Sequence, residues 1–292
     1  MKTNNVYQIV TDRIVEQMEK GIIPWHKPWA SVGGEGWAIS YTTRKPYSFL
    51  NQLLLGKGGE WLTFNQVKNA GGSIRKGAKS GFVVFYQQSI IKEQVVNENG
   101  EKEEKEFSVP VLRWYHVFHI DDCVGVESKI EVVEPSEEIQ PIEVAENIIE
   151  GYLTAESELT FQNDKPTDKA YYAPSRDMVV VPMLTQYEVA EEYYSTTFHE
   201  LIHSTMTESR CNRKAMMKNA AFGGEDYSLE ELVAEIGSAM LVNICGISTE
   251  KAFTNSVAYI QGWAKALKKN PKAIVWASAR AEKAARYIQG ER

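Results

Sequence analysis

Apolar residues recur at helical spacing in three stretches near the start of the chain. The pattern over 4–20 predicts an amphipathic helix, because apolar side chains return every three or four positions. A short apolar run at 47–55 predicts a buried helix. Residues 61–72 predict another, with Thr63 as its N-cap and Gly71 at its end. The beginning of the chain is therefore expected to be largely helical.

Two later runs in the same half are rich in β-branched and aromatic residues. Residues 81–91 and 110–120 therefore predict a pair of strands. The charged segment between them, 97–106, predicts a long solvated loop, so the strands are expected to form a hairpin. The acids and lysines of this loop require no function beyond solubility.

The second half of the chain is predicted to be almost entirely helical after a short mixed beginning. Residues 142–153 predict a helix, and 170–183 predict one or two strands with a turn at 173–177. From about residue 186 onward the apolar spacing predicts helices near 186–206, 228–245, 249–269 and 271–288.

An acidic segment with two prolines and no clear periodicity separates the two halves. This segment, 128–141, predicts a linker between a first domain at 1–127 and a second at 142–292. The expected fold class is α+β. An N-terminal α+β domain is followed by a mostly helical domain that carries a small sheet.

Composition narrows the classes of protein to which the chain can belong. The 292 residues are 43% hydrophobic and 24% charged, as in an ordinary folded protein. No apolar run approaches the roughly 18 residues that a membrane span requires, and Asp12 and Glu16 argue against a secretory signal at the N-terminus. Three widely spaced cysteines predict neither a disulfide framework nor a cysteine zinc site. A cytoplasmic location is the resulting expectation.

Charge is unevenly distributed along the chain, although the net value is only −7. Residues 1–92 hold 12 lysines and arginines against 5 acids, whereas 126–292 hold 17 against 26. A basic surplus confined to one end is compatible with a module that binds a polyanion. Uneven solvation without any function explains the charge equally well.

Two of the five histidines form an H-E-x-x-H motif within a predicted helix. His199 and His203 are four residues apart, so both imidazoles point to one side of the helix, one turn apart. Glu200 lies beside them, where its carboxylate can accept a proton from a water on the metal without itself binding the metal. The pattern predicts a catalytic metal helix. Two histidines that only share a structural helix are the alternative.

A third ligand is required, and the sequence offers two candidates. Met206 and Ser209 stand where a metzincin would carry its glycine and its third histidine, so that class is excluded. Glu231 and Glu235 lie four apart on a later helix, a pattern that resembles the second zinc helix of the gluzincins. We expect Glu231 to bind the metal and Glu235 to accept a hydrogen bond from a ligating histidine, the reverse being the alternative. The site suits Zn²⁺, and Mn²⁺ or Co²⁺ could also occupy it.

Aromatic and basic residues alternate in the N-terminal third. Flat rings that stack on bases, together with cations that meet phosphates, are typical of proteins that bind single strands of nucleic acid. A duplex would hide the base faces, so single-stranded DNA is the expected partner. Burial of the tryptophans in a core is the alternative. The candidate contact residues are Trp25, Lys27, Trp29, Trp37, Arg44, Lys45, Tyr47, Arg75, Lys76 and Lys79.

Ordered motifs run through nearly the whole chain and are similar to those of a known family. They include PWHKPW at 24–29, TTRKPYSFLN at 42–51, FHELIHST at 198–205, RCNR at 210–213 and EELVAE at 230–235. Taken together, they resemble the ArdC-type antirestriction proteins of mobile genetic elements. Several motifs in the same order over two domains are far more specific than any one of them.

The resemblance implies a sequence-nonspecific single-stranded-DNA-binding domain followed by a zincin-like metallopeptidase domain. It also implies that the protein protects incoming single-stranded DNA from host restriction. In this chain, His199 and His203 would then hold the metal, Glu200 would be catalytic, and an acid of EELVAE would supply the third ligand.

Three functions are compatible with these residues. The first is a DNA-protection factor whose peptidase domain cleaves a host restriction protein or another protein on DNA. In the second, the protein only coats single strands and the metal braces the fold. The third is a protease directed by DNA to proteins crosslinked to it. The peptide substrate is left open by the sequence.

Overall fold

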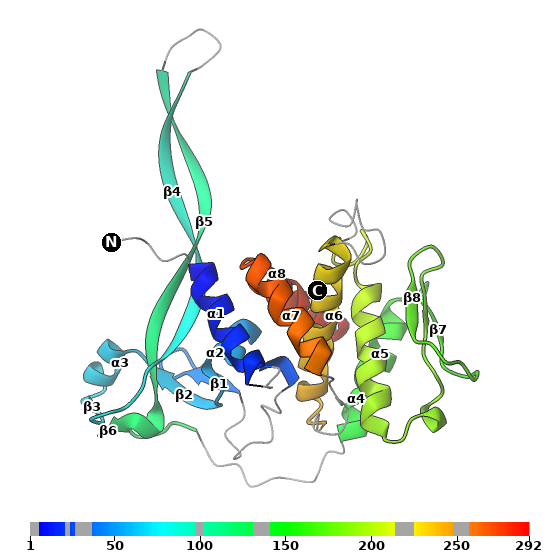
Figure 1. The fold of residues 1–292 in the computed structure, drawn as a ribbon. Helices are drawn as coiled ribbons and strands as arrows, with labels where there is room; N and C mark the ends of the chain where they lie inside the picture. The colour runs from blue at the N-terminus through cyan, green and yellow to red at the C-terminus, as the bar shows by residue number, and fades with distance from the viewer. Residues whose placement is uncertain are drawn as a thin grey trace.

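A long twisted hairpin rises from a body of helices and small sheets (Figure 1), and the α+β fold class is confirmed. The computed structural model describes residues 6–20, 24–26, 37–96, 102–130, 141–213, 225–247 and 257–291. Helix α1 (Val6–Glu19) agrees with the helix predicted over 4–20, and its buried face includes Val10 and Ile14. A short 3-10 turn, η1 (Pro24–His26), follows it.

The N-terminal sheet has four strands drawn from distant parts of the sequence. From one edge to the other, they are β1 (Ala38–Ser40), β2 (Gly59–Leu62), β5 (Lys102–His119) and β4 (Gly81–Val96). Strand β2 corrects the helix predicted over 61–72, because Trp61 and Leu62 pair with β5. The helix itself, α3 (Phe64–Asn69), begins after Thr63 in a capping box. Strands β3 (Ser73–Ile74) and β6 (Cys123–Val124) pair separately beside α3.

Helix α2 (Phe49–Leu55) bonds to both edges of this sheet through two consecutive side chains. Asn51 donates to the carbonyl oxygen of Val84 at 2.9 Å and accepts from its N–H at 2.8 Å, on edge strand β4. Gln52 makes the same pair of bonds with Ala38 on the other edge strand, β1, at 2.9 and 2.8 Å. The amide groups take the place of a neighbouring strand, so buried backbone groups at both edges are satisfied.

The hairpin of β4 and β5 confirms the predicted pair of strands but corrects the predicted loop. Pairing continues from Gly81 opposite Val117 out to Val96 opposite Lys102. Residues 102–106, half of the charged segment 97–106, therefore belong to β5, and 97–101 lies outside the described residues. The register places Lys92 opposite Glu106 and Glu93 opposite Lys105.

The second half is helical around a small three-stranded sheet, as predicted. The sheet has the order β7 (Thr160–Gln162), β9 (Met178–Val180) and β8 (Tyr171–Ala173). The helices are α4 (Pro141–Ala155), α5 (Ala190–Ser204), α6 (Glu225–Ile244), α7 (Val257–Lys269) and α8 (Ala273–Ile288). Two 3-10 turns complete the described elements, η2 (Ile120–Asp122) and η3 (Leu184–Gln186). Within the described ranges, no helix is both long and apolar enough to cross a bilayer.

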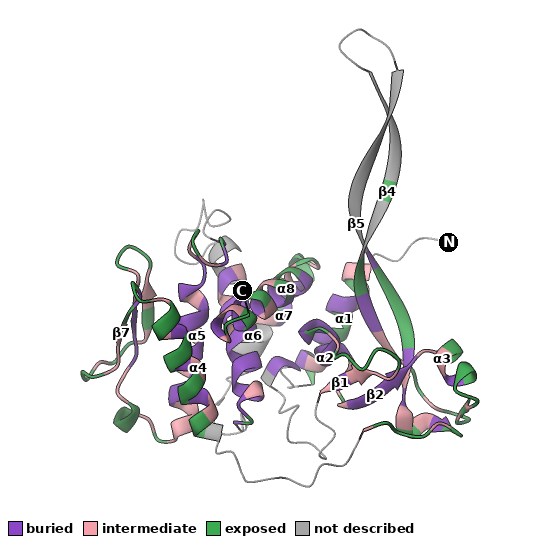
Figure 2. Ribbon diagram, turned by 180° about the vertical axis from the view of Figure 1, so that it is seen from behind, coloured by how far each residue is buried: buried purple, intermediate pink, exposed green. Residues whose placement is uncertain are grey.

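The two halves of the chain share one hydrophobic core. Helix α1 packs on α7 and α8, α2 packs on α8, and η1 packs on α6. Figure 2 shows buried residues where α5, α6 and α8 meet. Hydrogen bonds also join the halves: Thr11 donates to the carbonyl oxygen of Pro271 at 2.8 Å, and the N–H of Phe49 donates to Glu282 at 3.1 Å. The helices of the first half therefore help to hold those of the second.

Replacing Asn51 with alanine tests how much its hydrogen bonds to the edge of β4 contribute to stability. The N–H and C=O of Val84 would lose these buried partners, and each such loss costs about 1–3 kcal/mol. We expect the free energy of unfolding in urea to fall by about 2–3 kcal/mol. Asn65→Ala, on the exposed side of α3, is the matched control and should change it little. Equal shifts in the two variants would contradict the role given to Asn51.

Candidate metal centre

Close packing of α5 on α6 brings the candidate ligands together from two helices. Buried Phe198, Leu201 and Ile202 form the inner side of α5 around the histidines. On α6, Gly237 faces Ile202, and a Cβ built there would lie 2.7 Å from its Cδ1. The hydroxyl of Ser238 donates to the carbonyl oxygen of Ser195 at 2.7 Å and ties the two helices. Small residues on α6 therefore permit α5 and α6 to pack closely.

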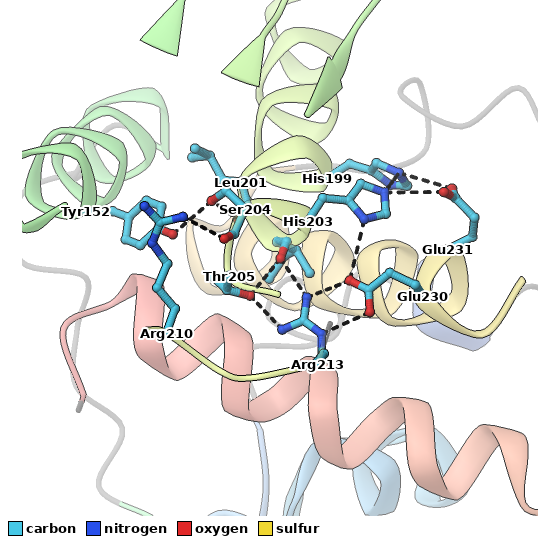
Figure 3. A network of polar contacts seen from close by, with 11 residues as sticks. Tyr152, His199, Leu201, His203, Ser204, Thr205, Arg210, Arg213, Glu230 and Glu231 are labelled. Carbon is cyan, nitrogen blue, oxygen red and sulfur yellow. Dashed lines mark hydrogen bonds and ion pairs between the residues drawn. The ribbon is translucent and has the colours of Figure 1, made fainter. Parts of the chain in front are cut away.

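His199, His203 and Glu231 converge at one point between the helices (Figure 3). The two Nε2 atoms are 3.1 Å apart. The carboxylate oxygens of Glu231 lie 3.5 Å from Nε2 of His199 and 3.4 Å from Nε2 of His203. All three ligand atoms lie within 4.8 Å of one another. Two imidazoles and one carboxylate at this spacing fit a divalent metal that keeps an open position.

Each histidine also has an acid on the side away from this point. Nδ1 of His199 lies 3.9 Å from Glu235, which is longer than the hydrogen bond predicted for that residue. Nδ1 of His203 lies 3.6 Å from Glu230, and Glu230 is 5% exposed. The sequence-based interpretation missed Glu230. The sequence pattern could have indicated that Glu230 lies near the histidines, because it shares a helix face with Val233 and Gly237. That face packs on α5.

Acidic groups dominate the electrostatic field at the point where the three candidate ligands converge. Burial lowers the pKa of the His199 imidazole, but the hydrogen bond to Glu231 and the charges of Glu235 and Glu200 raise it overall. Burial raises the pKa of Glu200 above its usual range, and the two histidines only partly oppose this. A cation between these side chains would be stabilised, as a metal site requires.

A cleft of about 410 Å³ opens beside the ligands and is bounded by an edge strand. Strand β8 contributes Tyr171 and Tyr172 to one wall, and Met206 contributes to the floor. A second hollow of about 260 Å³ borders Glu200 from the side of Glu192 and Tyr187. Glu200 therefore faces space on both sides, although its own side chain is only 8% exposed.

The predicted aromatic contacts with DNA differ in their exposure. Trp25 is completely buried in the core, as the alternative interpretation of the tryptophans proposed. Trp37 is half-buried and packs 6.1 Å from Phe49, centroid to centroid. Tyr47 is half-buried as well, and burial raises its pKa. Trp29, like Lys27 among the predicted cations, lies outside the described residues.

The predicted cations are mostly on the surface. Lys45, Arg75, Lys76 and Lys79 are exposed. Arg44 is exposed too, but its guanidinium pairs with buried Glu60 and donates to the carbonyl oxygen of Lys129 at 3.2 Å. These contacts give Arg44 a structural role at the start of the segment predicted as the linker.

Exposed rings on the hairpin form an aromatic row that the sequence-based interpretation did not include. Phe85 is 44% exposed and Tyr115 is 45% exposed, and their ring centroids are 5.9 Å apart. Tyr47 extends the row, 6.2 Å from Phe85. Exposed Arg113 lies opposite Phe85 in the strand register.

The sequence contained an indication of this exposed row in the dipeptides Phe85-Tyr86 and Trp114-Tyr115, because neighbouring residues of a strand point to opposite faces. A hairpin can bury only one of these faces.

Comparisons with known proteins match both halves of the chain to family models. Residues 4–118 match the model for the N-terminal domain of the anti-restriction factor ArdC. Residues 150–280 match the model for a zincin-like metallopeptidase. The second range contains every residue that converges at the candidate metal centre, and the first contains the sheet and most of the hairpin.

One curated relative and two solved structures are similar over almost the whole chain. The DNA primase TraC of Escherichia coli is 31% identical over an alignment of 298 positions, which covers 97% of this chain but 27% of that protein. The chain thus spans about a quarter of the length of this relative. Crystal structures of the antirestriction ArdC protein from the R388 plasmid, metal-free and Mn(II)-bound, are 28% identical with a TM-score of 0.71. They align with 98% of this chain and with 97% and 98% of theirs.

Replacing Gly237 with alanine tests the close approach of α5 and α6. The added methyl group would clash with Ile202, so we expect a loss of about 1–3 kcal/mol in the free energy of unfolding. Because α6 also carries Glu231, affinity for Zn²⁺ in a calorimetric titration should fall as well. Gly262→Ala, with nothing within 4 Å of its Cβ, should stabilise α7 by up to about 1 kcal/mol and leave metal affinity unchanged. Full Zn²⁺ affinity in Gly237→Ala would contradict the proposed dependence of the site on this contact.

Proposed function

The chain belongs to the ArdC-type antirestriction proteins, with an ArdC N-terminal domain followed by a zincin-like metallopeptidase domain, and from that premise we propose its function. It is a protein of a mobile genetic element that binds single-stranded DNA and protects it from restriction. Its second domain is a metal-dependent peptidase that cleaves proteins bound to DNA. The convergence of His199, His203 and Glu231 beside Glu200 carries the proposal.

The metal is proposed to be held by two imidazole Nε2 atoms and the Glu231 carboxylate. We propose Zn²⁺, with Mn²⁺ or Co²⁺ as alternatives, and the Mn(II)-bound structure of the R388 protein supports a divalent ion of this kind. When bound, such an ion supplies Lewis-acid polarisation of a water and of a substrate carbonyl. The carboxylates of Glu235 and Glu230 face Nδ1 of His199 and His203 at 3.9 and 3.6 Å, where their charge favours a proton on Nδ1 and leaves Nε2 of each histidine for the ion.

Glu200 is the proposed proton acceptor. Its carboxylate takes a proton from the attacking water and returns it to the amine that leaves the cleaved peptide bond. Burial raises the pKa of Glu200, which brings the group closer to the pH at which a general base must also act as an acid. Glu200 and Tyr172 both line the cleft.

An extended peptide is the proposed substrate of the cleft. Strand β8 is an edge strand in the order β7-β9-β8, and it lines the same cleft as Glu200. Edge strands can accept an extended peptide as an additional strand, because their outward backbone groups supply hydrogen bonds that do not depend on sequence. A peptide seated this way would pass Glu200 and the metal ligands.

The aromatic row of the hairpin is the proposed surface for single-stranded DNA. Tyr47, Phe85 and Tyr115 present rings on one face, with Arg113 and Lys45 as neighbouring cations. Bases of a single strand stack on such rings, and phosphates meet the cations. Lys76 and Lys79 precede β4 and extend the basic surface. Buried Trp25 and paired Arg44 are not included in this proposal.

A non-catalytic protein that coats single strands is the second candidate. It is favoured by the fact that the ligands come from both α5 and α6, so that a bound ion would also brace the helical half. In that function Glu200 would have no role, because it is not among the three converging ligands.

The variant Glu200→Gln separates the two candidates. We expect it to retain metal, measured by elemental analysis, and single-stranded DNA affinity, but to lose peptidase activity and protection of transferred DNA by at least about 100-fold. Glu192→Gln, on the same helix and beside the second hollow, is the matched control and should retain both activities. Full protection by Glu200→Gln would leave only the coating function.

Replacing Phe85 or Tyr115 with alanine tests the DNA surface. Loss of one stacking ring should weaken binding of single-stranded DNA by about 1–3 kcal/mol in fluorescence anisotropy, with little effect on duplex binding. Trp276→Ala is the control, because Trp276 is similarly exposed at 40% but lies on α8. Unchanged single-strand affinity in both hairpin variants would rule out this surface.

A further inference from the structure

Two arginines three residues apart, Arg210 and Arg213, lie in the short segment that follows α5. Their side chains are almost completely buried, at 3% and 4% exposure. Buried guanidinium groups require acidic and carbonyl partners, because an unpaired buried charge is strongly destabilising. Figure 3 shows that the two side chains reach different parts of the structure around the metal centre.

Arg213 connects the end of α5 to α6. Its Nε and Nη2 donate to the two carboxylate oxygens of Glu230, at 3.0 and 2.6 Å. Nη1 donates to the hydroxyl of Thr205 at 2.7 Å, and Nη2 also donates to the carbonyl oxygen of Ile202 at 2.8 Å. A planar guanidinium with these four contacts fixes both the position and the orientation of the Glu230 carboxylate.

The Glu230 carboxylate that Arg213 holds also contacts a candidate metal ligand, His203. Oε1 of Glu230, which accepts from Arg213, also lies 3.6 Å from Nδ1 of His203. A carboxylate that faces Nδ1 favours a proton on that nitrogen and leaves the Nε2 lone pair for the metal. Arg213, Glu230 and His203 therefore form one continuous chain of contacts from the loop to the ligand atom.

We infer that Arg213 is a positioning residue for the metal centre, acting through Glu230 on His203. It touches neither the ligand atoms nor the cleft, and its effect is to hold the Glu230 carboxylate in place, facing the imidazole. The inference rests on the proposed function only in taking His199, His203 and Glu231 as the metal ligands. It requires neither peptidase activity nor DNA binding.

Arg210 offers a matched comparison within the same segment. It makes paired bonds to Asp177 at 2.8 and 2.6 Å, one to Glu156 at 2.9 Å and one to the carbonyl oxygen of Ser204 at 2.7 Å. It is equally buried and equally well paired, but its acids belong to the β8–β9 turn and to the residue that directly follows α4. Neither acid is within ion-pair distance of a candidate ligand in the described residues.

The test compares Arg213→Met with Arg210→Met in the full chain. Affinity for Mn²⁺ alone is measured by titration with detection of the free ion by electron paramagnetic resonance. Both variants should lower the melting temperature, because each leaves a buried or half-buried acid without its arginine partner. Only Arg213→Met should weaken Mn²⁺ binding, by about 10–100-fold, as loss of a contact that orients a ligand does. Arg210→Met should remain within about twofold of the wild type.

Glu230→Gln provides a milder variant in case Arg213→Met does not fold. Glutamine keeps the shape of the side chain but removes the charge beside His203, so we expect a loss in Mn²⁺ affinity of about tenfold. Wild-type affinity in Glu230→Gln, or an equal loss in the two arginine variants, would overturn the inference. A wild-type protein that binds neither Mn²⁺ nor Zn²⁺ would overturn it together with the proposed function. Normal metal binding without peptidase activity would overturn only the proposed peptidase.

Discussion

The approach of α5 to α6 is the constraint on which the candidate site depends. His199 and His203 come from one helix and Glu231 from the other, so their distances are set by how closely the helices pack. Gly237 allows that approach, because any larger residue would meet Ile202. The same approach crowds several carboxylates into a partly buried space, where like charges repel. Cations must balance them, and Arg213 supplies one on the inner side of Glu230.

A second consequence of packing is that the two halves are not separate units in space. Helices α1 and α2 lie against α7 and α8, and Trp25 lies in the same core as the helix of the histidines. Figures 1 and 2 place the hairpin at one end of the molecule and the sheet beside the cleft at the other, with α1, α7 and α8 between them. The proposed DNA surface and the proposed peptidase site are thus held on one body. A protein attached to a bound strand would have to reach across these helices.

Local patterns predicted much of this structure, and their failures have physical causes. The helices over 4–20 and 142–153, the paired strands and the N-cap at Thr63 follow from periodicity and capping, which act between near neighbours. Strand β2 was missed because Trp61 and Leu62 pair with β5, more than fifty residues away. The charged segment 97–106 was predicted as a loop because its partners in β4 cannot be identified without the register.

What the sequence determined by itself is the set of groups that local spacing brings together. The four-residue interval on a helix places His199 and His203 on one side with Glu200 beside them, whatever the rest of the chain does. Tertiary structure decided which groups from elsewhere meet them. It placed Glu231 opposite both Nε2 atoms, joined Glu230 to Arg213, buried Trp25 and left Phe85 and Tyr115 exposed. These outcomes depend on contacts between distant parts of the chain, and periodicity carries no information about which distant segments will pack together.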